Sequence, residues 1–578
     1  MSSVEQDSGN IGSVISQAKC RISDQGSEAG NLLFFLFYNF KGGTAMKKLS
    51  AVFLRKDMGN SLFQKMFAMI LVFSLSVTLN SCTSGTSSGS GAPVAQNINA
   101  FISALQNDNF TVQEGQVAYY NSLKWASEGL IPTCFGNNAG SPYLTFVIPP
   151  APGQNPATGQ NPPVNYNPND PNNFPANPAF YPPGCLFKLR SDEAVVFVGD
   201  IAPPCVYFGF RSYVFFVENK TGKVYTSGVI GNDTVGWYHP IFGSLGDQLN
   251  NLNIFSQGTP YGSSGVPFGT KTVIIMTADQ GVNKRVRNAL LQSGYSPSIV
   301  NNDVIPSGLV NMGLEKGKDT FCFLMRISQW TDPVAGQNYI DNIGSKTRLF
   351  RITPNNSISL EPFPVPELKP RGSGKSEFEI FSNVTGDMET LRSAIIRQYA
   401  TSDYTYTELN TAIGLLEGWA AYANDTNAQG DNRDTTYLKA DNFQFNSDSD
   451  FVIIYGLNHD KSGKSIYSNS VLYGLNLLNG VASVYSSLFL HSANAFFPHE
   501  YTNSENYYVY KMARSPSYPG ENCVIVPYST GNPDGSAYGV DNNQDVFVAF
   551  RAYIERATGI GTSYYEIQYD RAIIFHKK

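Results

Sequence analysis

The chain has 578 residues, of which 13% are aromatic and only 15% are charged, with 40 basic and 46 acidic side chains. Residues 1–81 contain eight basic and five acidic residues, so the remainder has 32 basic and 41 acidic residues and a net charge of −9. This acidic balance argues against nucleic acid as a partner, because phosphate binding needs clustered Lys and Arg. It also argues against attachment to anionic lipid through a basic patch.

The amino-terminal region has the pattern of a targeting segment. A signal peptide stands at the amino terminus, which leaves residues 1–45 unexplained ahead of it. We interpret them as an over-extended start of the sequence or a disordered leader. Residues 46–81 form the signal peptide region, in which Lys65 precedes an apolar stretch from Met66 to about Leu79. The stretch has about 14 residues, fewer than the ~20 that cross a hydrocarbon core, so it does not predict a membrane span.

The signal region ends in Leu79-Asn80-Ser81-Cys82. This tetrapeptide resembles the lipobox of bacterial lipoproteins, in which the Cys becomes the mature amino terminus and carries acyl chains; Asn80 departs from the small residue usual at its position. The resemblance implies lipid attachment, including palmitate, at Cys82. It also implies a place in the bacterial cell envelope, anchored to the outer membrane or facing the periplasm. The alternative is an ordinary signal peptide or a buried helix with a chance Cys.

A Ser- and Gly-rich tether is predicted over residues 82–95. Residues 96–360 follow as a β-rich domain, in which strands such as Asp319–Trp330 are rich in the aromatic and apolar residues that favour sheets. Within this domain, residues 149–183 contain too many prolines for regular structure and predict a long surface loop.

A linker is predicted over residues 361–377, which contain four prolines and a charged tail. Residues 378–578 then form an α+β domain that opens with helices predicted over Gly386–Ala400 and Tyr406–Asn424 and continues with short strands. The whole sequence predicts an α+β, β-rich fold of two domains, each built on mainly antiparallel, sandwich-like sheets with a few packed helices.

The two domains share a weak pattern that suggests an internal duplication. In the first, DEAVVFVG leads through a turn to YFGFRSYVF, and DTFCFLMR comes later. In the second, SDFVIIYGLN leads to SIYSNSVLYG, and QDVFVAFR comes later. In each, an acidic residue starts an apolar strand and an aromatic strand returns from a tight turn. The alternative is that β-hairpins look alike by chance.

Export permits disulfides. Beyond Cys82 the chain has five cysteines, an odd number, and none has the C-x-x-C spacing of a metal site. Cys185 and Cys205 both follow Pro-rich turns and form the predicted disulfide, with Cys134 as the alternative partner. Cys322 lies in FCFLM, a buried-strand pattern, and is predicted to pack as a small apolar side chain.

A polar loop follows the second predicted helix of the second domain. Asp425, Asn427 and Asp431 have the alternating rhythm of a calcium loop, whose ligands are carboxylate and amide oxygens. Thr436 stands where an EF-hand needs a bidentate Glu, so a calcium site here would not be an EF-hand; no other cofactor is predicted. The alternative is an Asx-turn with an Asp–Arg pair, since Asp and Asn are ordinary turn formers.

Further candidates stand at strand ends and among aromatic residues. Asn458, His459 and Lys464 follow a buried-type strand, where a His can act as acid, base or ligand. A hairpin turn beside a solvated His is the alternative.

Arg211 interrupts an aromatic strand and His239 follows it in the chain. Arg211 could pair with a carboxylate, stack on a ring or receive an anionic ligand.

Seven residues would form one pocket if the fold brought them together: Arg211, His239, Asp431, Arg433, Asp434, Asn458 and His459. Such a pocket would suit an anionic or carbonyl-bearing ligand, with Arg for charge, His for proton transfer and Asp to orient the His. Lys464 would add a binding cation.

Two classes of function stay open. The first is a lipid-anchored cell-envelope protein that binds a glycan, a protein or another envelope component. The second is a lipid-anchored hydrolase that uses His459 or His239 as acid and base. The body resembles exported proteins without an assigned activity, in PPCVYFGFRSYVF, SLGDQLNN, GDNRDTTYL and YGLNHDKSGKSIYSN, and that resemblance implies no catalytic residue.

Overall fold

The computed structural model describes residues 32–37, 50–55, 96–123, 133–154, 184–220, 238–315, 317–530 and 539–578. The chain forms two compact units, residues 1–92 and 93–578. In the first unit, strands β1 (Leu32–Phe37) and β2 (Ser50–Arg55) pair antiparallel. Cys82 and the signal stretch before it lie outside the described residues, as does most of the predicted Pro-rich loop. Among the described helices, none is long and apolar enough to cross a membrane.

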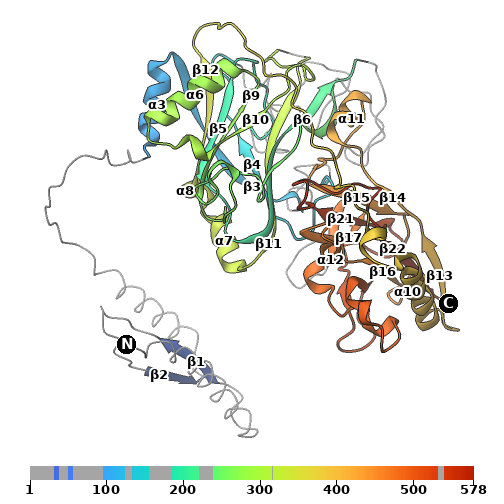
Figure 1. Ribbon diagram of the computed structural model, residues 1–578. Coiled ribbons are helices and arrows are strands. Elements are labelled where there is room, and N and C mark those ends of the chain that lie inside the picture. The colour runs from blue at the N-terminus through green and yellow to red at the C-terminus, as the bar shows by residue number, and fades with distance from the viewer. Residues whose placement is uncertain are drawn as a thin grey trace. The chain divides into compact units, whose positions relative to one another are not determined.

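The first half of the second unit contains one ten-stranded sheet, in the order β10-β9-β5-β12-β3-β4-β11-β6-β7 with β8 beside β6 (Figure 1). Its pairings are antiparallel except for β9 and β10, which are parallel and connected by α6. The strands are β3 (Phe110–Tyr120), β4 (Tyr143–Val147), β5 (Ala194–Asp200), β6 (Cys205–Glu218), β7 (Tyr238–Ser244), β8 (Leu249–Asn250), β9 (Lys271–Thr277), β10 (Val300–Val304), β11 (Thr320–Trp330) and β12 (Thr347–Pro354). The helices are α3 (Ile98–Asn107), α6 (Gln280–Gln292), α7 (Pro333–Asp341) and α8 (Ile343–Lys346).

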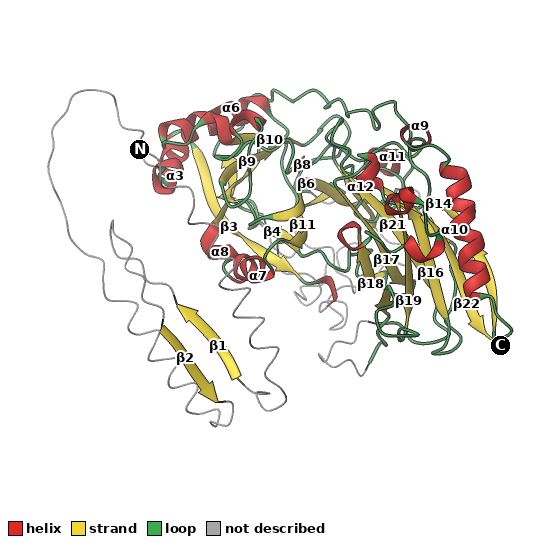
Figure 2. Cartoon of the chain, turned by 60° about the horizontal axis from the view of Figure 1, so that its bottom comes forward, coloured by secondary structure: helices red, strands yellow, loops and turns green. Residues whose placement is uncertain are grey.

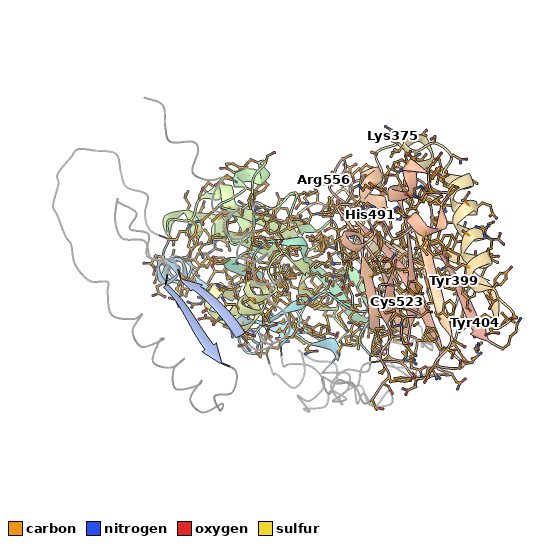
Figure 3. The ribbon with its side chains drawn as sticks, turned by 90° about the horizontal axis from the view of Figure 1, so that it is seen from below. Lys375, Tyr399, Tyr404, His491, Cys523 and Arg556 are labelled. Carbon is orange, nitrogen blue, oxygen red and sulfur yellow. The ribbon has the colours of Figure 1, made fainter. Side chains whose placement is uncertain are left out.

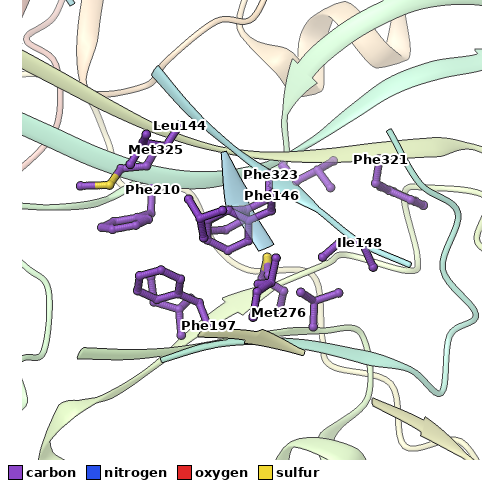
Figure 4. Packing of buried hydrophobic residues seen from close by; sticks show 14 of the residues in the cluster. Leu144, Phe146, Ile148, Phe197, Phe210, Met276, Phe321, Phe323 and Met325 are labelled. Carbon is purple, nitrogen blue, oxygen red and sulfur yellow. The ribbon is translucent and has the colours of Figure 1, made fainter. Parts of the chain in front are cut away.

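This sheet curls around its own core. Strands β5 and β6 are far apart in the strand order, yet Phe197 of β5 and Phe210 of β6 approach to 5.6 Å between ring centroids. Phe146 of β4 stacks on Phe197 at 5.3 Å and lies 4.2 Å from Phe323 of β11 (Figure 4). Curling the sheet brings rings from distant strands into one core, where burial stabilises the fold by roughly 25 cal/mol per Å² of apolar surface. This half is therefore a curled half-barrel and not the predicted sandwich.

The second half contains two five-stranded sheets, β13-β22-β16-β19-β20 and β14-β15-β21-β17-β18 (Figure 2). Leu438 of one sheet and Val452 of the other belong to a single buried cluster, so the two sheets share one core. The strands are β13 (Tyr404–Leu409), β14 (Thr411–Ile413), β15 (Thr435–Ala440), β16 (Phe451–Leu457), β17 (Tyr467–Gly474), β18 (Asn479–Tyr485), β19 (Tyr507–Ala513), β20 (Cys523–Ile525), β21 (Val546–Tyr553) and β22 (Arg571–Lys577). The helices are α9 (Glu377–Ile380), α10 (Val384–Tyr399), α11 (Gly418–Ala423) and α12 (His459–Ser462).

Helix α10 forms where its apolar spacing predicts it. Met388, Leu391 and Ile395 recur at three- and four-residue intervals and are all buried. They pack in the cluster that covers the outer face of the β16 sheet. Tyr399 ends the helix (Figure 3). Its ring lies 5.2 Å from the Phe451 ring at the start of β16.

The two halves repeat one topology. In chain order, β3 corresponds to β13 and β14 together, β4 to β7 correspond to β15 to β18, and β9 to β12 correspond to β19 to β22. Equivalent strands have equivalent neighbours and run in the same relative directions. The parallel pair β9–β10 corresponds to β19–β20, and α3 and α10 each precede the first strand. Strand β3 pairs continuously with β12 and then β4, whereas a break at Asn410 separates β13 from β14 and divides the second sheet into two. The strand order therefore supports the internal duplication.

One predicted helix is wrong. Residues 406–424 form part of β13, then β14 and the short helix α11. Tyr404–Leu409 pairs with β22 along its whole length, because its alternating Tyr and Thr residues favour a strand once a partner is present. Residues 361–376 contain no helix or strand element. Among the described strands of the second unit, each pairs only within its own half.

Candidate functional site

Each half has a loop that contacts the other half, and the two loops occupy equivalent positions in the fold. The loop before β4 reads GNNAGSPYL from Gly136, and the loop before β15 reads GDNRDTTYL from Gly430. Both glycines have left-handed backbones, with φ of 66° and 69°, which a glycine adopts without steric cost. The N–H of Gly136 donates to the carbonyl of Leu478 at 2.9 Å, and that of Gly430 to the carbonyl of Phe242 at 2.7 Å. Each loop is thus bound to the opposite half.

The loop asparagines repeat this exchange with side chains. Asn432 Nδ2 donates to the hydroxyl of Tyr207 at 2.7 Å, and Asn138 Nδ2 donates to that of Tyr467 at 3.4 Å. Tyr207 and Tyr467 occupy the same position in the equivalent strands β6 and β17. These buried polar contacts fix how the two halves fit together, since an unpaired buried donor is costly.

A cavity of about 300 Å³ lies where the two exchanged loops meet. Both halves line it, and aromatic rings make up much of its wall: Phe135, Tyr143, Phe242, Tyr437, Tyr473 and Phe547. Two arginines, Arg326 of β11 and Arg551 of β21, also line it. Concave, mostly apolar sites with a few convergent polar groups are where small ligands bind.

The two arginines occupy equivalent cradles. Arg326 pairs in register with Tyr143 of β4, and Arg551 pairs with Tyr437 of β15. The guanidinium of Arg326 lies 5.7 Å from the ring centroid of Tyr143, and that of Arg551 lies 5.3 Å from the centroid of Tyr437. A second tyrosine completes each cradle: Tyr213 lies 5.4 Å from Arg326, and Tyr473 lies 5.5 Å from Arg551. The duplication has therefore preserved one cationic site twice.

Each arginine also reaches the loop of the other half. Arg551 Nη2 donates to the carbonyl of Gly136 at 2.9 Å, and Arg326 Nη2 donates to the carbonyl of Gly430. Both side chains are buried, with residue exposures of 9% for Arg326 and 8% for Arg551. The Nε atom of each is buried without a hydrogen-bond partner among the described residues. Each arginine therefore adds a buried positive charge to the wall of the cavity.

The surrounding tyrosines do not neutralise these charges. Burial raises the pKa of Tyr437 and of Tyr473 far above the ordinary value of 10, although the nearby arginines oppose the shift. Burial alone would lower the pKa of Arg326. Together, the neighbouring phenol groups have the opposite and larger effect and raise the pKa above its ordinary value, so the guanidinium stays charged. In the described part of the chain, neither Arg326 nor Arg551 forms an ion pair with a carboxylate.

Asp431 is an acidic group near Arg326, whose positive charge acts on its carboxylate. Its carboxylate accepts hydrogen bonds from Ser244 N–H at 2.7 Å, Ser244 Oγ at 2.8 Å and Gly418 N–H at 2.9 Å. Burial raises the pKa of Asp431, while these donors and Arg326 lower it. The equivalent position in the other loop is Asn137, whose Oδ1 accepts the Gly480 N–H at 3.0 Å. Asn137 lines the cavity.

The seven residues expected to share one pocket are not brought together. Arg211 pairs with Asp303 at 2.5 Å, and His239 contacts Asp425 at 2.5 Å. His459 lies between two other carboxylates, Glu377 Oε1 at 2.8 Å and Asp570 Oδ2 at 3.3 Å. None of these three predicted residues lines the cavity between the halves.

The remaining predicted residues make structural contacts. Arg433 pairs with Asp247 at 2.6 Å. Lys464 is buried against Glu555 at 2.7 Å. The side chain of Asn458 accepts the Asp460 N–H at the start of α12.

Asp434 crosses to the first half. Its Oδ1 accepts from Asn250 Nδ2 at 2.8 Å, and its Oδ2 accepts from the Tyr207 hydroxyl at 3.0 Å. Burial raises the pKa of Asp434 to about 7, and the two hydrogen bonds partly offset that shift. Asp431, Arg433 and Asp434 all contact residues of the first half, so the GDNRD loop binds the two halves together.

The residues predicted for calcium each have their own partner. Asp425 contacts His239, and Asp431 binds Ser244 and Gly418. Asn427 Oδ1 accepts the N–H of Gln429 at 2.7 Å, which is the Asx-turn alternative. Among the described residues, no cluster of three or more His, Cys, Asp or Glu could hold a metal ion.

The predicted disulfide is absent. Cys185 and Cys205 are both free and buried, and they belong to different hydrophobic clusters. Cys134, the alternative partner, is also a buried free thiol. Cys322 packs beside Cys185 as a buried apolar residue, as its strand pattern predicts.

The sequence interpretation missed Arg326 and Arg551, although a signal was present. Both are the last residue of the aligned sequence stretches DTFCFLMR and QDVFVAFR, which the duplication pattern pairs with each other. The shared loop pattern, a Gly and an Asn followed by Tyr-Leu, also repeats in GNNAGSPYL and GDNRDTTYL. An arginine conserved between two copies of one fold would have been the stronger candidate.

Comparisons with known proteins assign no activity to this geometry. No family model and no curated protein matches the sequence. Among solved structures, the chain is similar to the VPA0106 protein from Vibrio parahaemolyticus, with 13% identity, 67% of this chain and 87% of that chain covered, and a TM-score of 0.30. It is also similar to an uncharacterized protein from Burkholderia cenocepacia, with 10% identity, 79% and 86% covered, and a TM-score of 0.28.

Proposed function

We propose that this is a cell-envelope binding protein whose ligand is a small organic anion held in the cavity between its two halves. One observation carries the proposal: two buried guanidiniums, Arg326 and Arg551, line the same cavity, and neither forms an ion pair with a carboxylate among the described residues. Arginine offers planar, paired donors to carboxylate and phosphate groups, and a dry setting strengthens such bonds.

Replacement of Arg551 tests the proposal directly. We expect benzoate or succinate to raise the Tm of the wild-type protein, because a ligand that binds only the folded state stabilises it. The Arg551→Met variant should lose this shift. Its unliganded Tm should be equal or higher, since an apolar side chain in place of a buried, uncompensated ion is often neutral or stabilising.

The matched control is Arg556→Met, which removes an exposed arginine near the end of the same segment (Figure 3). This control should keep the wild-type shift. Retention of the shift in Arg551→Met, or absence of a shift with both probes in the wild type, would contradict the proposed site.

The envelope location rests on the sequence. Leu79-Asn80-Ser81-Cys82 supports lipid attachment, and the Ser/Gly-rich tether after it would hold the folded body away from the membrane. Metabolic labelling with palmitate, in wild type and Cys82→Ala, tests this part separately. We expect label only in the wild type; equal labelling of both proteins would remove the anchor from the proposal.

A further inference from the structure

We infer that the ligand carries one anionic group, bound at the Arg551 end of the cavity, and a neutral hydrogen-bonding group at the Arg326 end. This inference rests on the proposed anion site and names the class of ligand. It comes from a position beside the arginines where the two exchanged loops differ in charge.

That position holds Asp431 in one loop and Asn137 in the other, each directly after the glycine whose carbonyl binds an arginine. Asp431 follows Gly430, which binds Arg326, so a carboxylate lies near that guanidinium. Asn137 follows Gly136, which binds Arg551. The near-symmetric site is therefore electrically unequal, with the charge of Arg551 left uncompensated.

The hydrogen bonds at the two positions agree with this division. All three donors at Asp431 come from Ser244 and Gly418, which hold its carboxylate in place. Asn137 lines the cavity and uses its Oδ1 for the Gly480 N–H, a bond that does not occupy its amide N–H groups. An anion at this end could accept bonds from both Arg551 and Asn137, where an Asp would repel it.

A third cation strengthens the Arg551 end. Lys439 lines the cavity on β15, the strand that pairs with β21. Its Nζ lies 4.7 Å from the ring centroid of Phe547 and 2.7 Å from Asn442 Oδ1. The corresponding residue on β4 is the uncharged Thr145. Positive charge thus gathers where the second half lines the cavity.

Three probes of one shape separate the alternatives: terephthalate with two carboxylates, terephthalamate with one carboxylate and one amide, and the neutral diamide. Isothermal titration of the wild-type protein should give the tightest binding for terephthalamate. Terephthalate should bind at least about tenfold more weakly, because Asp431, behind the cavity wall, offsets the charge of Arg326 and leaves a second carboxylate without a full counter-charge, and the diamide should not bind detectably. Terephthalate binding as tightly as terephthalamate, or more tightly, would overturn this inference and leave the proposed function standing. Failure of all three to bind would count against the proposed function itself.

The variant Asn137→Asp tests the same point from the protein side. It is nearly isosteric and keeps the oxygen that accepts the Gly480 N–H, so the unliganded Tm should change little. Terephthalamate binding should weaken at least about 30-fold, because a like charge now faces the carboxylate. Unchanged affinity in a folded Asn137→Asp variant would overturn the inference.

Discussion

The two halves have kept one strand order but hold it together with different polar groups. At the start of β5, Glu193 is fully buried and accepts two hydrogen bonds from Arg351. At the start of the equivalent β16, Asp450 accepts instead from His576, which is partly exposed. Conversely, a buried histidine lies between two carboxylates in the second half, at His459.

This difference shows which features each copy had to keep. Strand order follows from alternating apolar residues, which both halves retain, so the ion pairs around the sheets could change. The arginine–tyrosine cradles at the cavity did not change, although a buried cation that forms no ion pair with a carboxylate costs stability. A costly feature kept in both copies is better explained by binding than by folding.

The largest expected effect is at Arg351. This side chain is 0% exposed and also donates to the carbonyl of Lys188. Arg351→Met should lower the free energy of unfolding by about 3–5 kcal/mol, because it leaves Glu193 buried without its cation. His576→Gln, which removes the partner of the equivalent carboxylate Asp450, should cost less than about 1 kcal/mol. Urea unfolding of both variants checks this, and equal losses would contradict the stated difference between the halves.

His459 should make the second half sensitive to alkaline pH. Burial alone would lower its pKa, but Glu377 and Asp570 raise it well above 6.5. A raised folded-state pKa stabilises the protein fully below the unfolded value, near 6.5, and that contribution is lost as the pH rises through the folded value. The difference in Tm between wild type and His459→Gln should therefore be largest near pH 6 and shrink above it. A constant difference over that range would show that the imidazolium charge contributes nothing.

Asp434 gives a smaller pH effect of the same sign at the joint between the halves. Its folded-state pKa of about 7 lies above the ordinary value of 3.8. Its contribution is therefore fully present below about 3.8, declines as the pH rises from there, and is lost once the pH passes about 7. Thermal scans from acidic to mildly alkaline pH should show a steeper decline for wild type than for Asp434→Asn. Parallel curves would contradict this expectation.

Lys439 should have the smallest effect. It is only partly buried, so water and salt screen its charge. Lys439→Gln should weaken terephthalamate binding about two- to threefold at low salt, and the difference should vanish at high salt. Titration at two salt concentrations checks this. A large, salt-independent loss would place the anion closer to Lys439 than to Arg551.

Periodicity predicted the elements that pack on one face, including α10 and the long strands β6 and β11. It failed over 406–424, because alternating Tyr and Thr became a strand only when β22 supplied a partner. Pattern matching also aligned the three strand pairs of the duplication, since apolar alternation survives when individual residues change.

The candidate site depended on contacts between distant residues. Arg211 and Arg326 look alike in the sequence, as each interrupts an apolar strand. Arg211 has a carboxylate partner, Asp303, whereas Arg326 faces a cavity. No local signal distinguishes these outcomes, because the partner or its absence is decided by strands that meet only after folding.

A crystal structure of the protein with terephthalamate tests the central claim most directly. We predict the molecule inside the cavity between the halves, with its carboxylate bonded to Arg551 and Asn137 and its amide toward Arg326. An empty cavity at saturating probe, or a carboxylate bound away from both arginines, would contradict the proposal that the duplicated halves form an anion-binding site.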